Sequence, residues 1–164
     1  MEKEDLLKTA LELSAVTNDV YNEYSTKRDL LVAEINQIMS NRLDIIELVG
    51  SNNIDMMKDN HANHAKFVQS IIKRYNPEVL INTVIWVFKA YMSRGFHENY
   101  WSAQLNTWVT ILKRELSPKA YEMIFPLYNW FIVNIPHFTV LAHKQLSDNP
   151  NNTKIKNEKL RESI

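Results

Sequence analysis

Apolar residues recur every three to four positions along most of the chain, which is the spacing of amphipathic helices. The first such segment covers residues 4–23. We predict that Ser25 or Thr26 caps a second helix, which runs to Gly50, because glycine is the usual residue just beyond a helix end. The apolar side of this second segment is formed by Leu30, Leu31, Ile35, Ile38, Met39, Ile45, Ile46 and Val49.

The same spacing predicts four more helices in the rest of the chain. One covers residues 54–75, and the next begins at Pro77, since proline suits the first turn of a helix. That next segment contains VLINTVIWVFKAYM and is apolar on nearly all sides, so we expect it to be central and buried. A fifth helix follows Gly95, and a sixth begins at Ser117 and Pro118, a cap residue followed by proline.

Two prolines fall inside the apolar pattern of the sixth segment. We expect Pro126 and Pro136 to kink or break that helix, because proline removes a backbone hydrogen bond. From Gln145 onward the chain turns polar and rich in asparagine. The pattern therefore predicts a helical domain over residues 1–144 and a polar, mobile tail over residues 145–164.

Residue usage supports an all-α fold of about six helices in a single domain. The 164 residues include only 2 glycines and 5 prolines, and no hairpin or alternating strand pattern is present. The formal net charge is zero, which gives no electrostatic reason to expect binding to nucleic acid or to an anionic membrane. The chain has no cysteine, which excludes disulfides, thiolate catalysis and cysteine metal sites.

The chain begins with MEKEDLLKTALEL, which lacks the basic and apolar regions of a signal peptide. The longest uninterrupted apolar stretch, LINTVIWVF, is far shorter than a membrane span. We therefore expect a cytoplasmic protein. No nucleophile, metal-hydrolase or phosphate-loop motif occurs, so we do not expect an enzyme.

One of the two glycines stands at the corner between two aromatic helices, in the stretch AYMSRGFHENYW. We expect Gly95 to adopt a left-handed conformation, although a close approach of two helices would also explain it. Arg94 is placed to bond the last carbonyl groups of the preceding helix. The two residues are therefore interpreted as a structural corner.

The stretch RGFHENYWSAQLNTW resembles the corner between the two core helices of bacterial sensor globins and of the haem-free globin-like domains of stressosome regulators. The resemblance covers residues 79–135 and implies a globin-like helical bundle with a sensory role. Haem-binding members have a histidine about two residues before the arginine, and this chain has Met92 there. The haem-free members are therefore the nearer comparison.

Two histidines lie in the stretch MKDNHANHAKF. His61 and His64 share one helix face with Met57, Val68, Ile71 and Tyr75. They are interpreted as hydrogen-bonded interface residues, as ligand or pH-sensitive contacts, as part of a metal site, or as the residue facing haem or another tetrapyrrole. A metal site needs more ligands, and the sequence offers nearby only Asp59 and Asn60, which we expect to point elsewhere on the helix.

Most of the aromatic residues lie between Phe67 and Phe138, where they can form a core, line a pocket or associate with a second copy. We predict a cavity with His61 or His64 on one wall and Trp101 or Trp108 on another, and Met92 close by. The apolar content of the last two helices also predicts a homodimer.

These expectations combine into one function. The sequence predicts a non-catalytic cytoplasmic sensor or regulatory domain that binds a small apolar ligand or a signalling partner protein through its aromatic core. The alternative is a globin-like protein that binds haem or another tetrapyrrole through His61 or His64.

Overall fold

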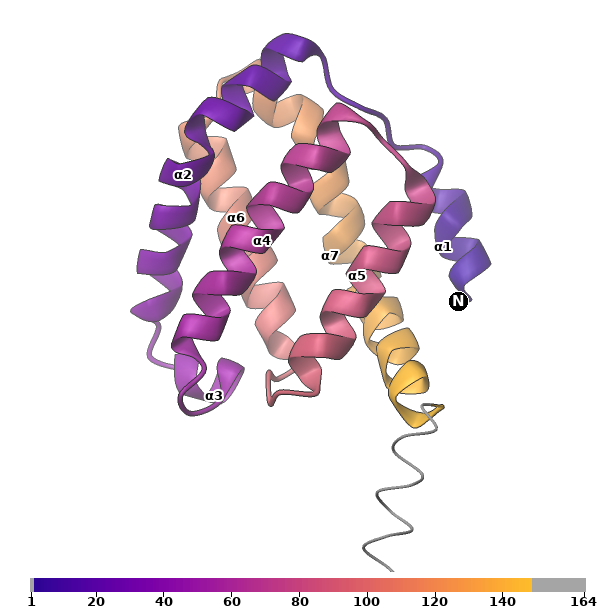
Figure 1. The fold of residues 1–164 in the computed structure, drawn as a ribbon. Coiled ribbons are helices and arrows are strands. Elements are labelled where there is room, and N and C mark those ends of the chain that lie inside the picture. Colours follow the sequence, from indigo (N-terminus) through magenta and orange to yellow (C-terminus); the bar gives the residue numbers. More distant parts are fainter. Residues whose placement is uncertain (1, 149–164) are drawn as a thin grey trace, which may run out of the picture.

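The computed structural model describes residues 2–148, which form seven helices and no strand (Figure 1). The helices are α1 (Lys3–Ala10), α2 (Asn18–Ser40), α3 (Ile45–Val49), α4 (Ile54–Lys73), α5 (Pro77–Met92), α6 (Asn99–Glu115) and α7 (Pro118–Ser147). The all-α fold is confirmed. The additional helix is α3, a short piece of five residues that the pattern did not separate from α2.

The N-terminal boundaries differ from the prediction. One continuous helix was expected over residues 4–23, but α1 ends at Ala10 and α2 begins after Thr17, whose backbone is extended. The amide of Val16 donates to the carbonyl of Ile72 over 2.9 Å, which ties the intervening segment to the end of α4. A contact between distant segments therefore overrides the local helical spacing.

The predicted cap residues of the second helix lie inside α2. The hydroxyl of Ser25 donates to the carbonyl of Tyr21 over 2.8 Å, a bond typical of serine within a helix. Thr26 also falls within α2, eight residues after its first residue. The expectation that Ser25 or Thr26 begins a helix is therefore wrong.

Both internal prolines lie within α7, which continues through Pro126 and Pro136. Their side chains are exposed, so water can reach the carbonyl groups whose N–H partners the prolines lack. Neither proline breaks the helix. The helix α7 also extends to Ser147, three residues past the domain boundary expected at residue 144. The part of the expected tail from residue 149 onward lies outside the described residues.

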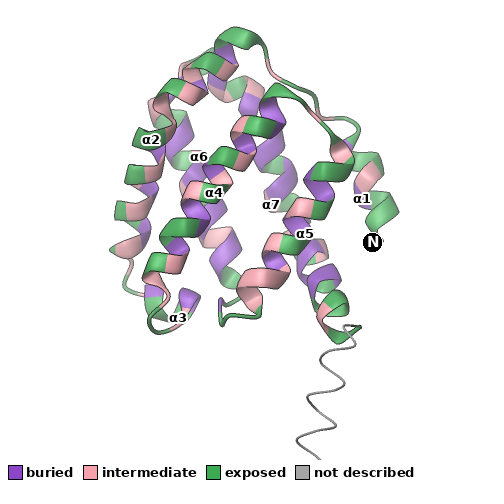
Figure 2. Cartoon of the chain, viewed as in Figure 1, coloured by how far each residue is buried: buried purple, intermediate pink, exposed green. Residues whose placement is uncertain are grey.

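The helices pack in pairs around one core, and the buried residues line their inner faces (Figure 2). α2 packs against α4 and α6, α7 packs against α5 and α6, and α1 packs against α5. In contrast, α4 and α5 lie side by side on one face but hardly touch each other. Residues of α6 and α7 close the inner side of the space between them.

α7 alone among the described helices is long and apolar enough to cross a membrane by length and composition. Of its most apolar window, 44% is buried against the rest of the molecule. A core helix that packs against α5 and α6 accounts for that composition.

Candidate functional site

The corner at Gly95 is a junction between two loops. Gly95 has a φ of +98° and Gly50 has a φ of +89°, so both glycines of the chain adopt positive φ. An ideal Cβ on Gly50 would lie 3.5 Å from the carbonyl oxygen of Gly95. The amide of Asn53 joins the two loops, because it donates to the carbonyls of Val49 (2.8 Å) and Arg94 (3.0 Å).

The expected left-handed conformation of Gly95 is confirmed, and close packing is excluded as its cause. A Cβ on Gly95 would meet no atom nearer than the Asn53 amide at 4.0 Å. The guanidinium of Arg94 points to α4, with Nη1 3.9 Å from the Met56 sulfur. It makes no bond to the end of α5 within the described residues, so the expected capping role is wrong.

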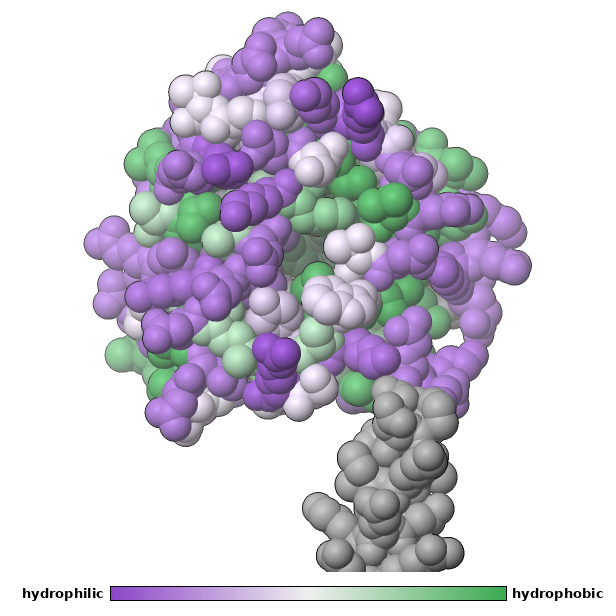
Figure 3. Space-filling model, in the orientation of Figure 1, coloured by the Kyte–Doolittle hydropathy of each residue, from purple (hydrophilic) through white to green (hydrophobic). Residues whose placement is uncertain are grey.

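An apolar recess of about 230 Å³ lies between α4 and α5. Its mouth is the hollow at the centre of the face drawn in Figure 3. His64 lies on the α4 wall, and Trp101 lies on the α6 wall. The recess is lined by Asn60, Asn63, His64, Phe67, Thr83, Val84, Trp86, Val87, Phe88, Tyr91, Trp101, Gln104, Leu105, Phe131 and Phe138. The predicted cavity is therefore present, with one of the two histidines and one of the two tryptophans on its walls.

Three of the predicted ligand-binding residues do not line this recess. His61 faces α2, where its Nδ1 lies 2.7 Å from Oδ1 of Asn36. Trp108 is fully buried between the two histidines, edge-on to His61 and stacked on His64 at 5.2 Å. Met92 is half-buried at the end of α5. These three residues support the walls of the recess or lie beside it.

The ring of His64 is held in one tautomer by Tyr128. The buried Tyr128 hydroxyl lies 2.6 Å from Nε2 of His64. Among the described residues, Nε2 is the sole hydrogen-bond partner of this hydroxyl. If the hydroxyl accepted, its own proton would be left unbonded in a buried place, so we infer that it donates to Nε2 and that the ring proton of a neutral His64 resides on Nδ1. Burial lowers the pKa of His64 to about 3, so the ring is neutral near pH 7.

Sequence reasoning missed a buried amide pair beside His64. Oδ1 of Asn60 accepts hydrogen bonds from the Tyr100 hydroxyl (2.8 Å) and from Nε2 of Gln104 (2.7 Å). Asn60 and Gln104 are both almost fully buried, and both line the recess. The expectation that Asn60 points away is wrong, because it precedes His64 by four residues and shares its face.

Trp101 is enclosed by other aromatic rings. It stacks on Phe88 with centroids 4.2 Å apart and meets Tyr91 and Tyr100 edge to face. Its indole Nε1 is buried and has no hydrogen-bond acceptor within the described residues. The aromatic residues of α5 and α6 therefore form one continuous cluster.

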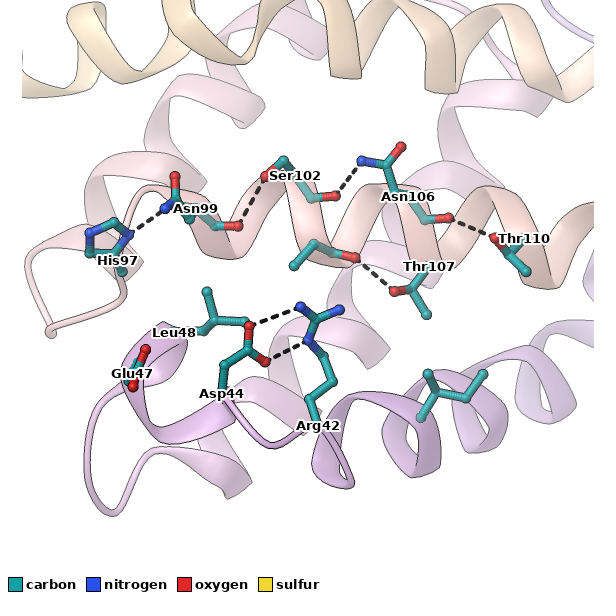
Figure 4. A pocket seen from close by; sticks show the side chains of 12 residues that line it. Arg42, Asp44, Glu47, Leu48, His97, Asn99, Ser102, Asn106, Thr107 and Thr110 are labelled. Carbon is teal, nitrogen blue, oxygen red and sulfur yellow. Dashed lines mark hydrogen bonds and ion pairs between the residues drawn. The ribbon is translucent and has the colours of Figure 1, made fainter.

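A second and larger cavity is a groove of about 760 Å³ between the end of α2, α3 and α6 (Figure 4). Along α6, Ser102, Asn106 and Thr110 each bond a carbonyl group of their own helix. Across the groove, Arg42 donates two hydrogen bonds of 2.9 and 3.0 Å to Asp44, and this pair lowers the pKa of the carboxyl group. The groove is polar and open to solvent.

The described residues contain no cluster of three or more His, Cys, Asp or Glu side chains that could hold a metal ion. Comparisons with known proteins add no relative: no protein-family model, no curated protein and no solved structure matches the chain.

Proposed function

We propose that the chain is a non-catalytic sensor or regulatory domain of the cytoplasm, which binds a small apolar ligand in the recess between α4 and α5. The observation that carries this proposal is a mostly apolar recess that opens at the surface between α4 and α5 and reaches the helical core, where close packing is the rule. A ligand there contacts two helices that hardly touch each other. Its binding would set their separation, which is a change that a partner protein can read.

We also propose that the arrangement is globin-like. Two facts support this: the recess lies between the two helices that precede the long α6–α7 pair, and α2 crosses both α4 and α6. The corner at Arg94 and Gly95, on which the resemblance rests, borders the recess through the neighbouring Tyr91 and Trp101.

Haem or another tetrapyrrole is the alternative occupant, and the recess fits it poorly. Nε2 of His64 is already bonded to Tyr128, and His61 is outside the recess. The α5 wall supplies Phe88 and Tyr91 rather than a histidine. An absorption spectrum of the purified protein separates the two: a Soret band would replace the apolar-ligand proposal by the tetrapyrrole alternative.

The proposed binding is tested with N-phenyl-1-naphthylamine, a neutral dye whose fluorescence rises in apolar sites. We expect saturable binding of one dye per chain. Val87→Phe should abolish it, because Val87 lines the recess and a phenyl ring would fill the space. Val79→Phe is the matched control on the same helix, since Val79 is exposed and outside the recess. Equal dye binding by both variants would refute the proposal.

We further propose a homodimer formed through the last two helices, with α7 as the main contact. Phe125, Val133 and Val140 are exposed on α7 at spacings of about two helical turns, so they share one face. Sedimentation at tens of micromolar should show a dimer. Val133→Glu should dissociate it, whereas Leu43→Glu, at a fully exposed position away from α7, should not. A monomeric wild-type chain would refute the dimer.

A further inference from the structure

Three polar side chains of the recess wall, on α4 and α6, lie close together. Asn60 and His64 stand one turn apart on α4, and Gln104 of α6 is bonded to Asn60. The remaining wall is aromatic or aliphatic except for Asn63 of α4 and Thr83 of α5. The recess therefore combines a buried polar cluster with mostly apolar walls.

Each of these three side chains has at least one hydrogen-bonding group left over. Oδ1 of Asn60 accepts two bonds, while its amide nitrogen makes none within the described residues. Nε2 of Gln104 donates to Asn60, while its carbonyl oxygen is without a donor there. His64 uses Nε2 for Tyr128 and keeps the Nδ1 proton free. None of these three atoms is among the fully enclosed polar atoms that lack a partner, and all three residues line the recess.

This set offers N–H donors from Asn60, from His64 and from the second N–H of Gln104, and one acceptor, the carbonyl oxygen of Gln104. A polar group with a carbonyl oxygen and an N–H matches it, because the oxygen accepts from the donors and the N–H donates to Gln104. No Lys, Arg, Asp or Glu lines the recess. A charged group would therefore lose its hydration without gaining an opposite charge.

The volume limits the size of the ligand. A cavity of about 150 Å³ holds benzene, so about 230 Å³ holds a compound of roughly two fused rings. Phe88 and Trp101 stack on each other at 4.2 Å, and both line the recess, so its wall offers aromatic surface that suits a planar ring system.

We propose that the recess is selective for an uncharged planar ring compound that carries one amide-like group, which is held by Asn60, His64 and Gln104. This inference rests on the proposed function and adds the chemical class of the ligand to it.

The test compares three probes of one shape by titration calorimetry at pH 7: 2-naphthamide, 2-methylnaphthalene and 2-naphthoate. We expect 2-naphthamide to bind at least about tenfold more tightly than 2-methylnaphthalene, since each net hydrogen bond contributes a factor of a few. The charged 2-naphthoate should bind most weakly. Equal or tighter binding of 2-methylnaphthalene, or tightest binding of 2-naphthoate, would overturn this inference and leave the proposed function standing. Binding of none of the three probes would overturn both.

A pair of histidine variants locates the effect. His64→Phe should remove most of the preference for 2-naphthamide over 2-methylnaphthalene, because the Nδ1 donor is lost. His61→Phe makes the same change three residues away and outside the recess, so it should keep the preference. Thermal melts check that both variants fold, and Gln104→Met provides a second loss of polar contact on another helix. If both His64→Phe and Gln104→Met kept the full preference for 2-naphthamide over 2-methylnaphthalene, the assignment of the amide-binding contacts to these side chains would be overturned.

Discussion

The two cavities differ in how their polar groups are satisfied. In the larger groove, the side chains of α6 bond to their own helix, and Arg42 bonds to its neighbour Asp44. In the smaller recess, buried polar groups bridge different helices and retain free donors and an acceptor. Volume alone would favour the groove. Polar groups without a partner in a mostly apolar recess favour the recess, since a ligand can supply the missing hydrogen bonds.

The largest expected effect is a loss of stability in acid that comes from the two histidines of α4. The pKa values of His61 and His64 are both lowered to about 3, by burial and, for His61, also by the neighbouring His64. Between about pH 6.5 and pH 3 the unfolded chain therefore binds more protons than the folded chain, and the free energy of unfolding falls as the pH falls.

From pH 7 to pH 5 this should amount to about 2 kcal/mol for each histidine, or about 4 kcal/mol for both. Urea denaturation at the two pH values measures it. His64→Phe should remove about half of the loss, and the double variant with His61→Phe nearly all of it. A wild-type stability that is constant over this range would show that the rings are not held neutral.

The next effect concerns the amide that joins α4 to α6. Asn60→Leu should lower the free energy of unfolding by about 2–4 kcal/mol, because it leaves the Tyr100 hydroxyl and the Gln104 amide without their acceptor in a buried place. Urea denaturation at pH 7 measures the change. A loss below about 1 kcal/mol would mean that this polar network contributes little to the recess wall.

A smaller effect is expected at the glycine junction. Gly95→Ala should cost roughly 1–2 kcal/mol from its positive φ alone, and Gly95→Asn should be milder, because asparagine tolerates that conformation. Gly50→Ala should cost more, roughly 2–3 kcal/mol, since its Cβ would also lie 3.2 Å from the Asn53 amide. Thermal melts rank the three variants, and a Gly95→Asn variant that melts well below Gly95→Ala would contradict the strain argument.

The smallest effect belongs to the groove. Asn106→Leu is the counterpart of Asn60→Leu, but Asn106 is exposed and bonds only the Ser102 carbonyl of its own helix. The free energy of unfolding should change by no more than about 0.5 kcal/mol. The same urea experiment serves, and a loss as large as that of Asn60→Leu would erase the distinction between the two cavities.

The sequence was informative where one local pattern dominates. Helical spacing predicted α4, α5, α6 and the start of α7 at Ser117, and the left-handed Gly95 followed from the end of an apolar run. The sequence pattern was misleading where contacts between distant segments determine the helix boundaries. The break before α2 depends on the bond from Val16 to Ile72, which no local spacing reveals.

The candidate site was predictable in outline only. The stripe of His61 and His64 identified the correct helix face, and the aromatic density identified the opposite wall. Which histidine faces the recess depends on the lateral position of α2, which covers His61 through Asn36. Asn60 was within reach of sequence reasoning, because its spacing of four from His64 places both on one face.

The Asn53 bridge has a consequence for the mouth of the recess. Its bond to Arg94 joins residues 41 positions apart, and the loop that it closes contains both α4 and α5. The same junction holds the contact between Arg94 Nη1 and the Met56 sulfur and the backbone bond from the His97 amide to the Leu48 carbonyl (2.8 Å). The neighbouring ends of α4 and α5, which flank the mouth, are therefore joined by several contacts at one place. Amide hydrogen exchange should accordingly report these two helix ends as one unit, because the contacts are lost together.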